Sequence, residues 1–387
     1  MAVNIYNSSI NGCYLGDSAI TAIYQGTELL YTTTPPIFEG KWLAKYSNGS
    51  TSSAECDSTS AITSGEINKT NLVDVRFGSC VTTIGDYAFD SCRTLRSINI
   101  PSGITSIGQQ AFDWCTSVTS VTFEEGSQLT SIDGEAFLGC GFTSIDIPSG
   151  VTSIGFMVFR LCERLTSVTM SDNVTSIGEQ AFNQCYRLSR LNSNTSGVIN
   201  LPSGLTSIGD SAFSNCRSLT SIDIPSGVTS IGEGVFHGCS GLTSVTIPNG
   251  LTSIGNYFFG GCKSLTSIDI PSSVTSIGVG AFMDCYSLSS IEIPSGVTSI
   301  SNSVFYDCYS LTSCTIGSGV TSIGNYAFEW CTSLTSVTVL ATTPPTLGNG
   351  AFNAIEGYEY PIYVPAASVS AYQTAWSDYS DRIQAIQ

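Results

Sequence analysis

The chain has 387 residues, with 13 basic and 30 acidic side chains and a formal net charge of −17. This balance argues against binding to nucleic acid or to an anionic membrane surface, because both are bound through Lys and Arg that neutralise phosphate. No apolar run reaches the roughly 18 residues of a transmembrane helix, so membrane insertion is not expected.

Residues 1–35 predict a small β module. The stretch CYLGDSAITAIYQGTELLY alternates apolar and polar residues, carries a Gln-Gly turn signal and is followed by the breaker TTTPP. The first residues lack the basic and apolar regions of a secretory signal, and none is expected. Residues 36–71 follow as a β-prone entry segment that is expected to cap the array after them.

Residues 72–352 repeat one pattern, L-T-S-I-x-I-P-S-G-V-T-S-I-G-x-x-A-F-x-x-C. Most of its cysteines are 23 residues apart, and the exceptions are intervals of 25, 22 and 31 before Cys140, Cys162 and Cys216. LTSIxI predicts a short strand, PSG a turn, VTSIG a second extended piece, and xxAFxxC a tight helical turn that points Phe and Cys inward. One unit cannot bury these apolar side chains alone, so the copies are expected to stack around a continuous core.

This pattern resembles the BspA-type leucine-rich repeat, which occurs in surface proteins of gut anaerobes and some protists and in proteins of gut phages. The resemblance extends from about Leu72 to Phe352 and implies a right-handed solenoid with a parallel sheet on one face. The expected fold class is therefore a leucine-rich-repeat solenoid, β-rich with short helical turns and about twelve stacked repeats. The first 35 residues resemble the short N-terminal modules of some gut-phage virion proteins.

The last segment, residues 353–387, looks like the C-terminal cap of the same family. IYVP predicts a strand, and the residues after Pro365 predict an amphipathic helix. The apolar face of that helix comprises Val369, Tyr372, Trp376 and Tyr379.

Eleven of the fifteen cysteines occupy the repeat position, in step with a phenylalanine. This predicts buried free thiols, because equivalent cysteines would have to pair along the axis of a regular stack to form disulfides. Cys314 replaces a strand Ile or Val and is also expected in the core, while Cys13, Cys56 and Cys80 stay undecided. The many free thiols suggest folding in a reducing compartment.

No catalytic, cofactor or metal set emerges from the sequence. The single histidine, His237, falls in a variable turn position, and there is no CxxC, phosphate loop or nucleophile elbow. We expect the protein not to be an enzyme. The alternative is a glycan-cleaving activity that uses a pair of carboxylates not recognisable in the sequence. The outward strand positions form a polar, mildly acidic ladder, either a solvated sheet or a surface for sugar hydroxyls or Ca²⁺.

The copies differ most around xxAFxxC, on the rim formed by the turns, where exposed aromatic side chains are candidate binding anchors. The main predicted contact surface consists of Tyr286, Tyr306, Tyr309, Tyr326 and Trp330. A rival surface consists of Arg160, Arg164, Arg187, Arg190 and Arg217. Beside it, the extra residues Asn192–Asn200 of the longest interval are expected to project as a loop. A third reading is unselected drift on a tolerant surface.

We therefore predict a non-enzymatic recognition or structural protein that displays a solenoid surface. The first choice is a phage virion appendage for receptor binding or decoration, held by other virion proteins through its N-terminal module. The alternative is a bacterial adhesin, on the cell surface or secreted, that binds host protein or glycan. In either case the expected partner is a protein or glycan on a cell surface, and an oligomer is possible.

Overall fold

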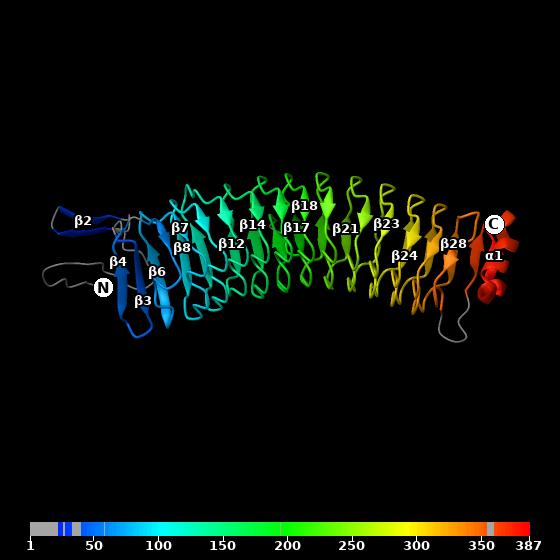
Figure 1. The fold of residues 1–387 in the computed structure, drawn as a ribbon, viewed down its shortest axis with the longest axis horizontal. Coiled ribbons are helices and arrows are strands. Elements are labelled where there is room, and N and C mark those ends of the chain that lie inside the picture. The colour runs from blue at the N-terminus through cyan, green and yellow to red at the C-terminus, as the bar shows by residue number, and fades with distance from the viewer. Residues whose placement is uncertain (1–21, 26–27, 33–39, 58, 194, 354–359) are drawn as a thin grey trace.

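The computed structural model describes residues 22–25, 28–32, 40–57, 59–193, 195–353 and 360–387. From β3 to the C-terminus, these residues form a long, curved solenoid, with β3, β4 and β6 at one end and α1 at the other (Figure 1). Strands β1 (Ala22–Gln25) and β2 (Glu28–Thr32) pair antiparallel, as the alternating pattern predicted. Cys13 lies outside the described residues.

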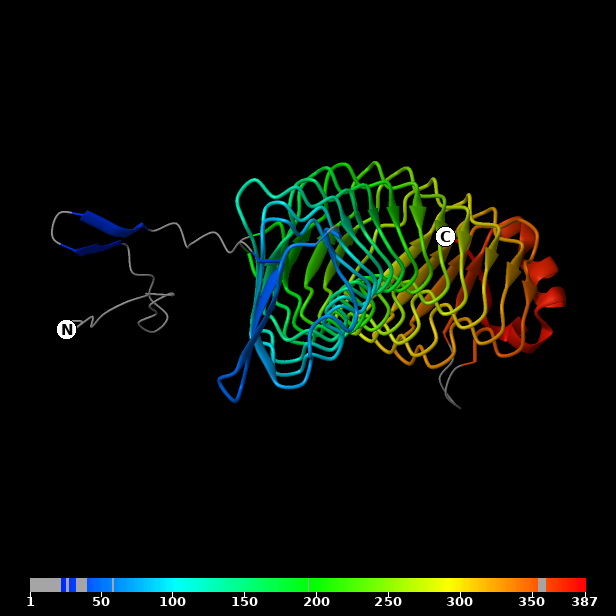
Figure 2. The ribbon, with the colours of Figure 1, turned by 60° about the vertical axis from the view of Figure 1, so that its left-hand side comes forward.

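Most turns of the solenoid contribute two short strands, which stack in parallel on two faces of the coil (Figure 2). The first face is built from the LTSIxI strands β8 (Ser97–Ile100), β10 (Ser120–Phe123), β12 (Ser144–Asp146), β14 (Ser167–Thr169), β16 (Arg190–Leu191), β17 (Val198–Asn200), β19 (Ser221–Asp223), β21 (Ser244–Thr246), β24 (Ser290–Ile293), β26 (Ser313–Ile316) and β28 (Ser336–Val339), and continues into β30 (Ile362–Val364) and β31 (Ile383–Ala385). The second face is built from β5 (Ala61–Ile62), β7 (Thr83–Ile84), β9 (Ser106–Ile107), β11 (Ser131–Ile132), β13 (Ser153–Ile154), β15 (Ser176–Ile177), β18 (Ser207–Ile208), β20 (Ser230–Ile231), β22 (Ser253–Ile254), β23 (Ser276–Ile277), β25 (Ser299–Ile300), β27 (Ser322–Ile323) and β29 (Thr346–Leu347).

One phenylalanine from each turn stacks in a single column through the core. Successive ring centroids from Phe89 to Phe352 lie 5.1–6.0 Å apart with nearly parallel planes. Phe77 closes one end of the column edge-on, and Trp376 closes the other at 5.6 Å from Phe352. The repetition of the sequence thus builds one continuous hydrophobic core, as predicted.

The twelve described free cysteines, Cys314 included, are all buried, which confirms the core interpretation. In ten of them the thiol donates a hydrogen bond to the carbonyl oxygen of the phenylalanine one turn earlier, as in Cys239 to Phe213 at 3.1 Å. A thiol therefore satisfies a buried carbonyl that an alanine would leave without this partner. The cysteine is both a small apolar side chain and a hydrogen-bonding link between turns.

Threonine hydroxyls form two further ladders along the array. On the first face, Thr243 donates to the carbonyl oxygen of Thr220 at 2.9 Å, and on the second face Thr105 donates to that of Thr82 at 3.1 Å. The same bond recurs in most turns. The LT and VT threonines are thus part of the hydrogen-bonded scaffold rather than only solvated surface.

The Ala-Phe-x-x-Cys segment is a series of tight turns, not the expected helical turn. In the turn of Cys115, Gln110 and Trp114 adopt left-handed backbone angles, with φ of 53° and 52°. Alternate N–H groups bond to the next turn, as in Phe112 to the carbonyl oxygen of Ala136 at 2.8 Å. A helix cannot form because these N–H groups point along the solenoid axis instead of back along the segment.

Two additional phenylalanines coincide with interruptions in the strand ladders. Phe142 takes the place of a repeat leucine, and Phe258 takes the place of a repeat alanine; both are fully buried. The hydrogen-bonded sheets of both faces break next to these turns, between β10 and β12 and between β21 and β24 on the first face. The spacing in the phenylalanine column widens there to 5.8–6.0 Å, against 5.1–5.5 Å elsewhere. The extra ring volume spreads neighbouring turns.

The insertion before Cys216 does not project as a loop, so that expectation was wrong. Its apolar residue Ile199 is fully buried and pairs with Leu191, which makes β17 an extra strand between β16 and β19. On the second face β15 pairs directly with β18, with no extra strand between them. The insertion is drawn into the sheet because Ile199 continues the buried column of the first face.

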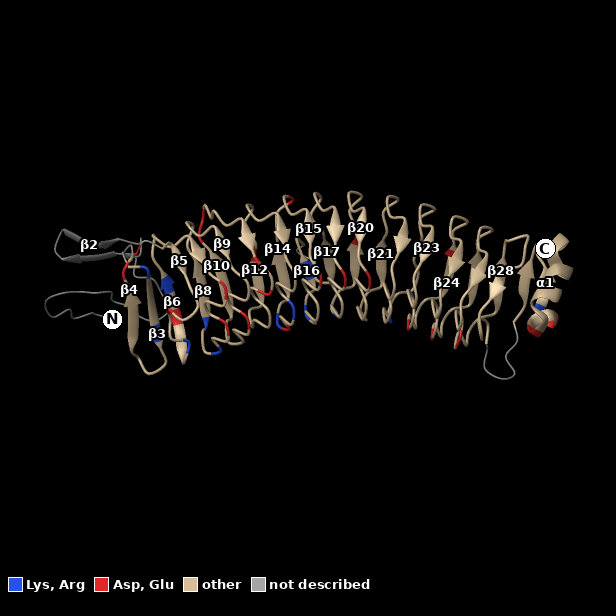
Figure 3. Cartoon of the chain, in the orientation of Figure 1, with Lys and Arg blue, Asp and Glu red and all other residues tan. Residues whose placement is uncertain are grey.

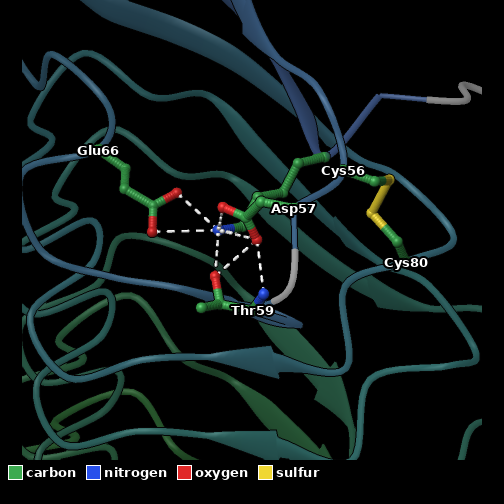
Figure 4. Close-up of a disulfide and its surroundings, with 6 residues drawn as sticks. Cys56, Asp57, Thr59, Glu66 and Cys80 are labelled. Carbon is green, nitrogen blue, oxygen red and sulfur yellow. Dashed lines mark hydrogen bonds and ion pairs between the residues drawn. A yellow bond between two sulfur atoms is a disulfide. The ribbon is translucent and has the colours of Figure 1, made fainter.

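The N-terminal end is closed by an antiparallel sheet of β4 (Thr51–Ala54), β3 (Trp42–Tyr46) and β6 (Leu72–Phe77), with β6 beside β8. Cys56 and Cys80, which the sequence left undecided, form a disulfide beside this sheet (Figure 4). The amine of Lys41 is buried among Asp57 at 3.2 Å, Glu66 at 3.1 Å and the hydroxyl of Thr59 at 3.0 Å. Burial acts to lower the pKa of Lys41, but the hydrogen bonds to Glu66 and Asp57 outweigh it and the pKa is raised.

The C-terminal end combines helix and strand. The predicted strand is β30, but the predicted long helix is divided into η1 (Ala366–Ser368), α1 (Val369–Ala375) and η2 (Ser377–Arg382). The last residues, expected as helix, instead form β31 in parallel with β30. Tyr372 and Trp376 are buried as predicted, and Trp376 donates its indole N–H to the carbonyl oxygen of Pro345 at 2.8 Å.

Candidate binding surface on the solenoid rim

The residue that follows each repeat cysteine forms a column on the rim. Equivalent positions in adjacent turns lie about one strand spacing apart, close enough for large side chains to contact one another. The rings of Tyr286 and Tyr309 pack against each other in this column, with centroids 5.1 Å apart and planes tilted by 34°. The amine of Lys263, one turn earlier, lies 5.0 Å from the centroid of the Tyr286 ring. The column therefore presents a cation followed by two aromatic rings.

The other three predicted aromatic anchors lie in different columns. The Tyr306 hydroxyl interacts with Trp330, which directly precedes Cys331 and is 45% exposed. Tyr326 directly precedes the buried Ala-Phe pair of its turn. Its ring lies close to Gly350 at the equivalent position of the next turn, where a Cβ would be only 3.0 Å from the ring. The structure therefore arranges the five side chains as two pairs and a separate ring rather than as one strip.

Glycines allow some of the exposed rings to lie flat along the axis. Trp114 lies over Gly139, and Tyr257 lies over Gly280, in each case at the equivalent position of the next turn. Both glycines have positive φ, and a side chain there would collide with the ring. Part of the aromatic content of the rim thus covers the backbone of the following turn.

Acidic side chains surround the Tyr286–Tyr309 pair. Asp284 and Asp307 precede the cysteines of adjacent turns, and their carboxylates interact. Burial raises the pKa of Asp307, the charge of Asp284 adds to this, and a hydrogen bond with Tyr309 opposes it. Burial, together with the charge of Asp307, also raises the pKa of the Tyr309 phenol. Asp284 and Asp307 were not among the predicted binding residues, although their equivalent positions before two successive repeat cysteines are visible in the sequence.

The rival arginines are divided between two places. Arg164 and Arg187 are exposed at equivalent positions of adjacent turns, and the Arg217 guanidinium stacks 4.8 Å from the Tyr186 ring centroid. Arg160 is half-buried and donates to the sulfur of Met157 at 3.3 Å, while Arg190 lies in β16 on the first face. In Figure 3 blue segments gather on the lower rim near β14 and β16, and red segments follow on the same rim near β24.

His237 lines a shallow hollow of about 420 Å³ with Tyr257, Asp210 and Glu233. Gly234 opens the hollow, because the equivalent positions on either side carry side chains. Asp210 accepts a hydrogen bond from the backbone N–H of Glu233 at 2.8 Å, and no carboxylate is hydrogen-bonded to His237 anywhere in the described ranges. The hollow therefore lacks the oriented acid–imidazole pair that imidazole catalysis requires.

The outward ladder of the first face is partly satisfied by its own hydroxyls. Thr122 donates to Asn99 at 2.9 Å, and Thr246 donates to Asp223 at 2.6 Å. In the part of the chain that the structure describes, no three His, Cys, Asp or Glu side chains come together as a metal site. The bonds between neighbouring turns favour the solvated-sheet interpretation of this face.

Stacked two-strand turns around a phenylalanine column, with the greatest variation on the rim, define the class of a leucine-rich-repeat solenoid. The family model described as "BspA type Leucine rich repeat region (6 copies)" matches residues 82–198, 192–312 and 252–367. The chain therefore belongs to the BspA-type leucine-rich repeat family. Proteins built on such solenoids use their extended surfaces as binding or structural scaffolds.

One solved structure has the same fold, and two others match with lower TM-scores. A leucine-rich repeat protein from Eubacterium ventriosum is 25% identical, with a TM-score of 0.51, and the match covers 73% of this chain and 82% of that one. A leucine-rich repeat protein from Bacteroides ovatus is 24% identical, with a TM-score of 0.48 and coverage of 89% and 98%. A leucine-rich cell surface protein from Faecalibacterium prausnitzii is 26% identical, with a TM-score of 0.33 and coverage of 71% and 93%. No curated protein matches the chain significantly. Across the described residues, no helix is both long and apolar enough to cross a bilayer.

Proposed function

We propose that this chain is a non-enzymatic recognition protein that binds a partner on a cell surface through the rim of the turns of Cys285, Cys308 and Cys331. The observation that carries the proposal is the group of aromatic side chains at variable positions there, with Tyr309 and Trp330 40% and 45% exposed. Exposed Tyr and Trp bury a large area with few rotatable bonds when a partner covers them.

The division between fixed and variable positions supports this proposal. The inward Phe and Cys and most LT and VT threonines bond or stack with the neighbouring turns, so a change at these positions disturbs the array. Exposed rim side chains such as Tyr309 and Trp330 lie outside these phenylalanine, cysteine and threonine ladders, and their positions differ from turn to turn. Variation at these positions is therefore available for selecting a partner.

We place this recognition protein on a phage virion, as a receptor-binding or decoration appendage attached through residues 1–35. The resemblance of those residues to virion modules is the motive. The second candidate is a bacterial surface adhesin, and the Cys56–Cys80 disulfide is compatible with both, because disulfides persist outside reducing cytosol. An antibody against the chain should label purified phage particles; labelling of bacterial envelopes alone would favour the adhesin.

Removing the two exposed rings should abolish most binding to cells. We expect the Tyr309→Ala, Trp330→Ala double variant to bind intact gut bacteria about tenfold or more weakly than wild type, because the anchors of an interface carry most of its binding energy. The measurement is retention of the labelled full chain on a panel of cells. The Arg164→Ala, Arg187→Ala double variant should bind like wild type, because the rival arginine surface is not expected to contact the partner.

A matched control uses rings of similar exposure elsewhere in the array. Trp114 and Tyr257 are 40% and 43% exposed, so Trp114→Ala, Tyr257→Ala removes comparable surface from other turns. This variant should retain wild-type binding. Normal binding of the Tyr309→Ala, Trp330→Ala variant would overturn the proposal. Normal binding of both aromatic variants and of the arginine variant would indicate that the residue differences on the rim are unselected.

A further inference from the structure

The rim column of Lys263, Tyr286 and Tyr309 ends in an aromatic ring over which no cation lies in the part of the chain that the structure describes. Lys263 lies over Tyr286, Tyr286 packs against Tyr309, and the next residue of the column is Thr332, which has no ring. Tyr309 is the more exposed of the two tyrosines, with 40% of its surface accessible. One end of this stack is thus completed by a lysine of the chain itself, and the other end is open.

The charges beside the open ring have no positive partner on the same rim. Asp307 interacts with the Tyr309 hydroxyl, and Asp284 of the preceding turn interacts with Asp307. Between residues 218 and 353 the chain has seven acidic residues and a single basic one, Lys263. Within the described residues, neither Asp284 nor Asp307 forms an ion pair.

We propose that the Tyr309 ring, with the carboxylates of Asp284 and Asp307, binds a lysine or arginine side chain from a basic surface of a protein partner. An ammonium or guanidinium over the ring is attracted by its negative face and donates hydrogen bonds to the two carboxylates. Within the described residues, the rim column already places a cation over a tyrosine ring at two points, with Lys263 over Tyr286 and Arg217 over Tyr186. This inference rests on the proposed function of the rim and specifies the partner's charge.

The two carboxylates at the site change the expected dependence of rim binding on salt. Binding led by aromatic rings alone is insensitive to salt, whereas binding of a cation beside two carboxylates weakens as ionic strength rises. The rival arginine patch would also give salt-dependent binding, but it would select acidic partners. The sign of the partner's charge therefore separates the two surfaces.

The test is binding of an oligolysine peptide to the full chain, measured by calorimetry at low and high salt. The same peptide with acetylated amines serves as the neutral probe. We expect the oligolysine to bind, the acetylated peptide to bind about tenfold more weakly or not at all, and added salt to weaken the first interaction. Asp284→Asn, Asp307→Asn and Tyr309→Ala should each weaken binding severalfold, and Tyr309→Phe should not.

The matched controls carry the same change of net charge elsewhere. Asp223→Asn and Glu233→Gln each remove one exposed acid outside the rim pair, as Asp284→Asn and Asp307→Asn each remove one within it, and each should leave oligolysine binding unchanged. An equal loss in these controls would show that net charge alone attracts the peptide, and it would overturn the proposed site. If oligolysine does not bind while cell binding still requires Tyr309 and Trp330, the cation site is wrong and the rim function stands. If oligolysine does not bind and cell binding does not require Tyr309 and Trp330, both the cation site and the proposed rim function are wrong.

Discussion

Raising the pH above about 9 should unfold the solenoid in a steep transition, because its buried thiols can ionise only in the unfolded chain. All twelve described free cysteines are buried. Burial raises the thiol pKa of eleven of them, that of Cys239 to about 12, and a hydrogen bond with Cys115 together with burial raises the pKa of Cys92. An unfolded thiol ionises near pH 8.5, so the stabilisation is complete below that pH and is lost between the unfolded and folded pKa values. In this window the contribution of each thiol to the unfolding free energy falls by about 1.4 kcal/mol per pH unit. For twelve thiols together the decrease is on the order of 16 kcal/mol per pH unit.

Circular dichroism between pH 7 and 11 checks this expectation. A variant with Cys239→Ala, Cys262→Ala and Cys285→Ala should show a shallower dependence on pH, whatever its stability at pH 7. A thiol reagent should find few reactive groups in the folded chain at pH 8 and at least twelve in denaturant, with two more after reduction of Cys56–Cys80. An unchanged pH dependence in the triple variant would show that the thiols are not the titrating groups.

Truncation of one ring in the core column should have the next largest effect. Phe259→Ala removes a fully buried ring whose centroid lies 5.8 Å from that of Phe236 and 5.5 Å from that of Phe282. The substitution should lower the unfolding free energy by about 3–5 kcal/mol. In an array of nearest-neighbour contacts, hydrogen exchange should first increase in the adjacent turns and only then spread.

The neighbouring residue offers a matched comparison. Phe258 is equally buried, but most turns have alanine at its position, so the array can close around a smaller side chain there. Phe258→Ala should therefore cost less than Phe259→Ala in urea unfolding. If Phe259→Ala unfolds like wild type, the ring is not part of the core column and the assigned register is incorrect.

The periodic features of the fold were predictable from the sequence because each copy repeats the same packing problem. A phenylalanine and a cysteine at a fixed offset in every turn can only line one interior, and the structure confirms both columns and places Cys314 among the buried residues. The role of threonine was less visible. Its hydroxyl bonds to the turn before it, which is a contact between residues 23 positions apart.

Features that depend on contacts between particular turns could not be predicted. The insertion looked like a loop because its polar residues dominate, yet the burial of Ile199 against Leu191 decides its path. The pairing of Cys56 with Cys80 depends on how the entry segment folds against the first turn. On the rim, the sequence places Tyr309 after a repeat cysteine and Tyr326 before a repeat phenylalanine. Which of these columns come into contact depends on left-handed turns that the sequence does not mark.

The rim around Tyr309 and Trp330 is proposed to face the partner. Hydroxyl-radical labelling of the full chain, free and bound to cells that retain it, tests this interface. Tyr257 and Trp114 are internal references, since their exposures of 43% and 40% are close to the 40% and 45% of Tyr309 and Trp330. We predict that binding protects Tyr309 and Trp330 from oxidation and leaves Tyr257 and Trp114 unchanged. Protection of the reference rings, with Tyr309 and Trp330 still oxidised as in the free chain, would contradict the account.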